Sequence, residues 1–420
     1  MMGSRNGVVG ILIGAALVTV FLVPANGSAQ QDVFRVDPCS ISNILYTTEL
    51  AALINCAASG YAPDQYKVGL LYAYGITLPE NNAEAARWFQ MAAEQGHPAA
   101  QHNLGLMYAD SDGVPEDDVE AVRWYRLAAE QGYVPAQGNL GVMYDNGHGV
   151  PEDDVEAVRL YRLAAEQRFG PAQYNLGVMY NHGNGVLEDD AEAVRWYRLA
   201  AAQGFAAAQY NLGVMYDHGD DVPEDDAEAV RWYQLSAAQG FAAAQYNLGV
   251  MYDHGTGVPE DDAEALRWYR LAAEQEYVIA QFALGMMYSQ GVGVPKDEAE
   301  AVRWYQLAAE QGDALAQSNL GVILAQRWYS YHVRLLDAHG DVLAQANFGL
   351  VEQDLVFAYK WFTLAEAQGS ETAQTNKGVI EQWLTREHIA EAQRLSQEWV
   401  DTHPPQGGGE PSETIRLPGR

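Results

Sequence analysis

The stretch that decides the fold runs from residue 208 to residue 240 and reads AQYNLGVMYDHGDDVPEDDAEAVRWYQLSAAQG. It returns with few changes every 36 residues. The glycine of its Leu-Gly pair recurs at Gly69, Gly105, Gly141, Gly177, Gly213, Gly249, Gly285 and Gly321. A fixed period of this length is the signature of a solenoid, in which each repeat packs only on its neighbours. The 420 residues are therefore expected to form one array rather than two or three unrelated domains.

Each repeat is predicted to contain two helices, named segment A and segment B here. Segment A, as in residues 171–181, follows a turn and carries the recurrent glycine. A glycine inside a helix costs about 1 kcal/mol relative to alanine, so its recurrence predicts close approach of segment B. Segment B, as in residues 225–239, starts from an acidic run in which Asp225 and Glu228 have the spacing of a capping box. The acidic run is thus interpreted as a helix start rather than a cation site.

Segment B is apolar on most sides, and its polar residues form one solvent stripe. Glu120 with Arg123, and Arg126 with Glu130, are spaced for helical ion pairs. The tryptophan that follows Arg123 recurs with the period, and we interpret this column as packing core rather than a ligand site.

The formal net charge of -32 argues against binding to nucleic acid or to anionic lipid. The chain contains no G-x-S-x-G, S-x-x-K or H-E-x-x-H sequence and no glycine-rich phosphate loop. The sequence therefore predicts a non-enzymatic protein without a cofactor or a bound metal.

The N-terminus has the layout of a secretory signal peptide over residues 1–29. Arg5 precedes the apolar run 8–23, and small residues follow up to Ala29. The alternative is an uncleaved membrane anchor, for which the run is short. We expect a periplasmic or secreted protein that keeps no stable membrane insertion after cleavage.

Residues 30–60 are expected to form an N-terminal arm and a capping half-repeat. They hold both cysteines of the chain, Cys39 and Cys56, and an oxidising compartment favours a disulfide between them. The register of residues 53–60 puts Cys56 at a core position. Two buried free thiols are the alternative.

Residues 61–321 are predicted to be regular repeats. After Gly321 the Leu-Gly pair becomes Phe348-Gly349 and then Lys377-Gly378, at shorter spacings. Residues 322–400 are therefore predicted to be shortened repeats with a C-terminal capping helix. Residues 401–420 contain PPQGGGEP and are expected to be a disordered tail.

The pattern A-x-x-x-L-G-x-x-Y, a Gly-rich loop and A-x-x-W-Y-x-x-A-A-x-x-G resembles the Sel1-like repeat family, which is related to tetratricopeptide repeats. The resemblance covers about residues 61–400 and departs locally, with Leu160 in place of tryptophan. It implies an all-α fold, an α/α superhelical solenoid of about nine helix-hairpin repeats with capping helices at both ends. It also implies a scaffold or adaptor, and bacterial members are often exported.

The resemblance implies that segment A lines the concave face, and this face is the candidate partner-binding site. An aromatic row comprises Tyr174, Tyr210, Tyr246 and Phe282. An aliphatic row comprises Val178, Val214 and Val250, with Met286 and Val322 further on. A polar row comprises Asn181, Asp217 and Asp253, with Asp145 and Ser289 at its ends, beside His182, His218 and His254. The alternative is that these rows only pack between adjacent repeats. One repeat separates the histidines, which argues against a shared metal ion.

These observations favour a scaffold that binds a protein or peptide partner of unknown identity along the groove, with oligomeric state left open. A subunit of a cell-envelope or polysaccharide-export assembly is one alternative. A β-lactam-binding or -hydrolysing enzyme is another, but the related enzymes carry a cysteine pair in each repeat, whereas this chain has one pair in all.

Overall fold

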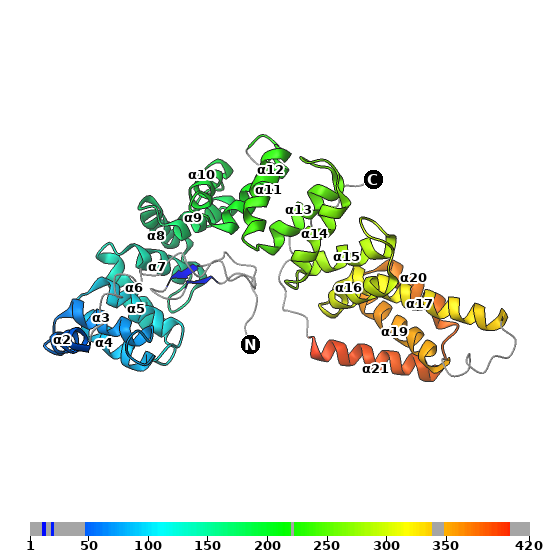
Figure 1. Cartoon of the computed structure of the whole chain (residues 1–420), viewed down its shortest axis with the longest axis horizontal. Coiled ribbons are helices and arrows are strands. Elements are labelled where there is room, and N and C mark those ends of the chain that lie inside the picture. Colours follow the sequence, from blue (N-terminus) through cyan, green and yellow to red (C-terminus); the bar gives the residue numbers. More distant parts are fainter. Residues whose placement is uncertain (1–10, 14–17, 21–46, 220–221, 338–347, 404–420) are drawn as a thin grey trace. The chain divides into compact units, whose positions relative to one another are not determined.

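A computed structural model describes residues 11–13, 18–20, 47–219, 222–337 and 348–403, and nearly all of them are helical (Figure 1). The chain divides into two compact units, an N-terminal one that ends at Phe241 and a C-terminal one that begins at Ala242. Each unit is a series of helical hairpins, so the predicted all-α repeat fold is confirmed.

In the N-terminal unit, α2 precedes five hairpins, and each hairpin pairs a segment A helix with the segment B helix that follows. The helices are α2 (Thr47–Ala58), α3 (Ala62–Ala73), α4 (Asn82–Glu94), α5 (Pro98–Ala109), α6 (Asp118–Glu130), α7 (Val134–Asn146), α8 (Asp154–Glu166), α9 (Gly170–His182), α10 (Asp190–Ala201), α11 (Ala206–His218) and α12 (Asp226–Ala238). Two short antiparallel strands, β1 (Ile11–Ile13) and β2 (Val18–Val20), also belong to this unit.

The C-terminal unit continues the pattern with three hairpins and then two further helices. Its helices are α13 (Ala242–His254), α14 (Asp262–Ala273), α15 (Val278–Gln290), α16 (Glu298–Glu310), α17 (Ala314–Asp337), α19 (Phe348–Ala367), α20 (Glu371–Glu381) and α21 (Arg386–Thr402). Thr385 caps α21 and accepts a hydrogen bond from the His388 amide at 3.2 Å.

The recurrent glycine lets the two helices of a hairpin approach closely, as predicted. A Cβ atom placed on Gly177 in α9 would lie 2.7 Å from ring carbons of Tyr197 in α10. Tyr197 is itself fully buried. Glycine weakens the helix, but its missing side chain lets the tyrosine ring pack directly against the helix backbone.

The acidic run starts segment B, although its hydrogen bonding differs from the predicted capping box. The Asp225 side chain accepts from the Glu228 amide at 3.0 Å, as a cap residue should. Glu228, however, pairs with Arg231 at 3.2 Å instead of reaching back to the cap. The Asp225 amide is already bound to the carbonyl of Tyr216 at 2.9 Å, and this removes the donor that a capping box needs.

The tryptophan column lies in the core of the repeats, as predicted. Trp124, Trp196 and Trp304 are buried. The preceding arginine of each covers the outer side of the indole ring, with its guanidinium carbon 4.7–4.9 Å from the ring centroid. This cation–π contact shields the ring from water at the surface of the array.

A ladder of glutamines joins consecutive repeats, and the sequence interpretation missed it. Gln173 in α9 donates to the carbonyl of Ala165 in the preceding repeat at 3.0 Å. Its side-chain oxygen accepts from Gln203 at 2.7 Å. Equivalent pairs, each 30 residues apart, recur in both units. The ladder satisfies buried carbonyl groups at the ends of the B helices.

Several of the described loops between segments A and B rest on the start of the preceding B helix. A Cβ atom on Gly149 would lie 2.3 Å from the carbonyl oxygen of Asp118, the first residue of α6. Gly149 also has a φ of 67°, so two independent constraints select glycine here. The same contact joins Gly185 to Asp154 at 2.3 Å.

The helix that carries Gly321 packs on a distant part of the chain, and the division of residues 322–400 into shortened repeats and a capping helix stays a prediction. Gly321 faces Phe362, with a Cβ-to-ring distance of 2.6 Å, so α17 and α19 form the next hairpin. The glutamine pair of this hairpin, Gln317 and Gln368, is 51 residues apart instead of 30, which makes the hairpin longer. The left-handed glycine that ends α15, Gly291, is replaced one period later by Arg327, and α17 therefore continues.

The N-terminal expectations fall partly outside the described residues. Cys39 lies outside them, so the disulfide stays a prediction. Cys56 is exposed, so its expected core position is wrong. The adjacent Ala57 is buried instead, because among the described helices α2 packs chiefly on α3 and no earlier repeat covers its other side. The described strands β1 and β2 fall inside the apolar run 8–23. Within the described residues no helix combines the length and hydropathy needed to cross a bilayer.

Candidate functional site

Two of the four members of the aromatic row lie in the core, where the packing alternative holds. Tyr174 and Tyr246 are both 5% exposed. Tyr174 packs on Tyr197 with ring centroids 5.9 Å apart, and Tyr246 packs on Tyr269 at 5.5 Å. Each row member thus contacts the ring that packs on the hairpin glycine, and the apolar area gained by this stacking explains the burial.

Tyr210 and Phe282 occupy the same position in other repeats but are only half-buried. Tyr210 lies 6.0 Å from Tyr233 and 5.2 Å from Phe241, measured between ring centroids. Phe282 lies 5.8 Å from Tyr305. These two rings combine packing with partial access to solvent.

The aliphatic row changes character along the chain. Val178 in α9 is buried, whereas Val214 in α11 and Val250 in α13 are half-buried. Met286 in α15 is 36% exposed. The packing alternative therefore holds at Val178, and the later members keep apolar surface available.

The polar row is tied to the tyrosines of segment B. The Tyr233 hydroxyl donates to Asp217 Oδ2 at 3.2 Å, and the Tyr269 hydroxyl donates to Asp253 Oδ2 at 3.3 Å. Burial raises the pKa of Asp217, while the Tyr233 hydrogen bond opposes that shift. Asn181 holds the equivalent place in α9 and is half-buried. These carboxylates support the hairpin as well as facing outward.

The histidine column is exposed. His182, His218 and His254 are the last residues of α9, α11 and α13. Among the described residues no group of three or more His, Cys, Asp or Glu side chains is arranged to hold a metal ion.

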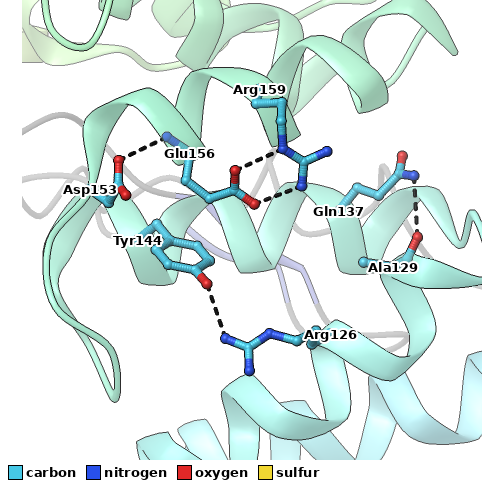
Figure 2. A network of polar contacts seen from close by, with 7 residues as sticks. All are labelled: Arg126, Ala129, Gln137, Tyr144, Asp153, Glu156 and Arg159. Carbon is cyan, nitrogen blue, oxygen red and sulfur yellow. Dashed lines mark hydrogen bonds and ion pairs between the residues drawn. The ribbon is translucent and has the colours of Figure 1, made fainter.

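The outer side of the repeats is occupied by internal contacts (Figure 2). Glu156 pairs with Arg159 at 2.6 Å next to the Asp153 cap, as the spacing of these residues predicts. Arg126 differs from expectation, since it donates to the Tyr144 hydroxyl of the following repeat at 3.0 Å rather than pairing with Glu130. This hydrogen bond connects one repeat to the next.

A pocket of about 280 Å³ opens in the C-terminal unit between α15, the start of α16, and α17. Its apolar lining includes Met286, Val322 and Ile323. Its polar lining includes Ser289, Lys296, Glu298, Tyr305 and Asn319. Met286, Ser289 and Val322 belong to the rows that the sequence singled out, so the structure brings members of two rows together here.

The sequence interpretation did not single out Lys296 or Asn319. A signal for Lys296 was present, because the equivalent position one repeat earlier is Glu260, and two repeats earlier it is Glu224. The floor of the pocket is polar, since Ser289 Oγ donates to the Met286 carbonyl at 2.9 Å and lies 3.4 Å from the Tyr305 hydroxyl. The pocket therefore offers hydrogen-bonding groups, apolar surface, one cation at Lys296 and one carboxylate at Glu298.

Comparison with known proteins gives one family. The family model described as Sel1 repeat matches eight segments, which are residues 62–97, 98–133, 134–169, 170–205, 206–241, 242–277, 278–313 and 343–370. No curated protein matches the chain.

Two solved structures illustrate the similarity. One is c5321, described as a protective antigen present in uropathogenic Escherichia coli strains displaying an SLR fold, at 31% identity and a TM-score of 0.54. That match covers 85% of this chain and 95% of the other. The second is a Sel1 repeat protein from Oxalobacter formigenes at 36% identity and a TM-score of 0.55, covering 67% of this chain and 80% of the other. With eight matched segments and these neighbours, the chain belongs to the Sel1 repeat family.

Proposed function

We propose that the protein is a non-enzymatic scaffold that binds a protein or peptide partner on the exposed side of its A helices. Sel1 repeat folds commonly mediate protein–protein interaction. The observation that carries the proposal is a surface of the same composition on one A helix of each unit. Val214, Asp217 and His218 form it in α11, and the same three residue types form it in α13.

This surface suits a protein partner. Half-buried valine gives apolar contact area, while the neighbouring aspartate and exposed histidine supply polar contacts at a fixed repeat. An apolar and polar surface of this kind on one helix suits contact with an extended peptide or a helix of the partner.

The proposed location is the periplasm or the exterior of the cell, supported by the apolar run that follows Arg5. Cell fractionation together with N-terminal sequencing of the mature protein tests it. A chain recovered in the cytoplasm with residues 1–29 intact contradicts the proposal.

Photocrosslinking in cells tests the binding surface. A photoreactive residue at Val214 is expected to capture a defined partner, which mass spectrometry then identifies. Arg231 in α12 is the control, because its side chain is exposed on the B helix and paired with Glu228. Capture from Arg231 but not from Val214 would place the binding surface on the B helices instead.

A further inference from the structure

The pocket in the C-terminal unit lies where the repeat architecture lacks a part that other repeats have. In regular repeats the loop of the next repeat covers the first residue of each B helix. A Cβ on Gly293 would lie 2.4 Å from the carbonyl oxygen of Asp262, the first residue of α14. Gly185 covers Asp154 in the same way in the N-terminal unit.

The first residue of α16, Glu298, lacks this cover. One period after Gly293 stands Tyr329, which lies inside α17 and is 57% exposed. Because α17 continues as a helix through this position, the described residues that correspond to the covering loop do not turn back over Glu298. Glu298 lines the 280 Å³ pocket instead. The pocket is therefore the place that a glycine-containing loop fills in the other repeats.

The charge in the pocket is also unlike that of the other repeats. Lys296 stands where Glu152, Glu188, Glu224 and Glu260 stand in the four repeats before it. Among the described residues Lys296 is exposed and forms no ion pair within 4.0 Å. Glu298 lines the same pocket, and its charge adds to the raised pKa of Arg327 after the hydrogen bond and the charge of Asp354, with which Arg327 is paired. Lys296 is thus left as a cation open to a ligand.

We propose that this pocket binds an acidic turn of a protein partner, with a partner carboxylate paired to Lys296. The turn occupies the space that the next loop fills elsewhere. Asn319, Tyr305 and Ser289 offer hydrogen bonds to its peptide groups, and Val322 and Ile323 contact a small apolar side chain. The inference rests on the proposed scaffold function and assigns it a ligand class and one specific site.

The chain itself supplies a suitable probe, because its own loops fill the equivalent place. A fluorescein-labelled peptide of sequence GTGVPEDD copies residues 255–262. We expect the full chain to bind it with a Kd below about 1 mM at low salt, measured by fluorescence anisotropy. A peptide with lysine in place of its Glu and Asp residues is expected not to bind.

Two variants test the site. Lys296→Glu restores the residue that the other repeats carry, so folding is expected to be unchanged, and peptide affinity is expected to fall at least about tenfold. Ile323→Trp fills the pocket and is expected to weaken binding similarly. The matched control is Glu260→Lys, which places a lysine in a repeat whose B-helix start is covered by Gly293; its affinity should stay within about twofold of the original. Circular dichroism checks that all three variants are folded.

The inference is overturned if the Lys296→Glu variant binds the acidic peptide as tightly as the unaltered chain does. It is also overturned if the unaltered chain does not bind this peptide. Equal binding of the lysine peptide overturns it too. The scaffold proposal is judged separately by crosslinking from Val214. A chain that captures a partner through Val214 but ignores the acidic peptide keeps its scaffold function and lacks this pocket specificity.

Discussion

The hydroxyl of Tyr161 in α8 donates a hydrogen bond to Asp145 Oδ2 in α7 at 3.1 Å. Burial raises the pKa of Asp145 to about 7, and the Tyr161 hydrogen bond only partly opposes this. The folded-state pKa thus lies above the ordinary value of 3.8. The protonated Asp145 carboxyl therefore makes its full contribution to the stability of the folded state below pH 3.8. This contribution is lost as the pH rises through 7.

Asp145→Asn should therefore remove the loss of folding stability that ionisation of the buried Asp145 carboxyl causes at high pH. At pH 8 the variant is expected to unfold with a free energy higher by on the order of 1–3 kcal/mol, with little difference at pH 4. The fold accepts asparagine here, because Asn181 holds the equivalent position in the next repeat. Urea unfolding across this pH range measures the effect, and Asn181→Asp should show the opposite trend. A difference that does not change with pH would contradict the assignment.

Gly321→Ala should destabilise the C-terminal unit by about 1–3 kcal/mol, because its Cβ would lie 2.6 Å from the Phe362 ring. Gly378→Ala in α20 is the matched control, since no atom lies within 4 Å of its added Cβ. That control should stabilise by about 1 kcal/mol through helix propensity alone. Thermal unfolding compares the two variants, and an equal response would rule out close approach as the reason for the recurrent glycine.

Gln173→Leu should lower the free energy of unfolding by about 2–3 kcal/mol. The change leaves the buried Ala165 carbonyl without its 3.0 Å donor, and it leaves Gln203 without its 2.7 Å acceptor at a partly buried position. Gln90→Leu serves as control, because Gln90 contacts only the exposed Glu94, and a change within about 0.5 kcal/mol is expected. Denaturant titration distinguishes a structural ladder from a set of incidental contacts.

Asp225→Ala should cost about 1 kcal/mol, because it removes the acceptor for the Glu228 amide at the start of α12. Asp226→Ala, one residue later, removes only a charge near the helix N-terminus and should cost a few tenths of a kcal/mol. Equal losses in urea unfolding would mean that helix-dipole charge, not capping, explains the acidic run.

Part of the candidate site could be predicted from the sequence, and part could not. The period and the Leu-Gly pair placed Val214, Asp217 and His218 on one side of an A helix. They could not reveal that Tyr174 is buried while Tyr210 is half-buried, because both hold the same place in nearly identical repeats. That difference depends on which rings and helices pack beside each residue.

The region after Gly321 also shows what could and what could not be predicted from the sequence. The Phe348-Gly349 pair lies in the matched repeat segment 343–370, and Phe362 of the same segment packs on Gly321. The period of the sequence cannot reveal residues that lengthen both helices of one hairpin. Such an insertion keeps the packing between the helices and changes only the number of residues between the packed positions.

The sequence by itself determined the hairpin repeat, the caps that start each B helix and the glycine that brings the helices together, because these depend on contacts within a repeat. Only the tertiary structure decided which side chains stay open and where a pocket forms. Those features depend on contacts between repeats. Beside Lys296 the space depends on α17, which continues as a helix where the chain turns into a loop in the repeats before it.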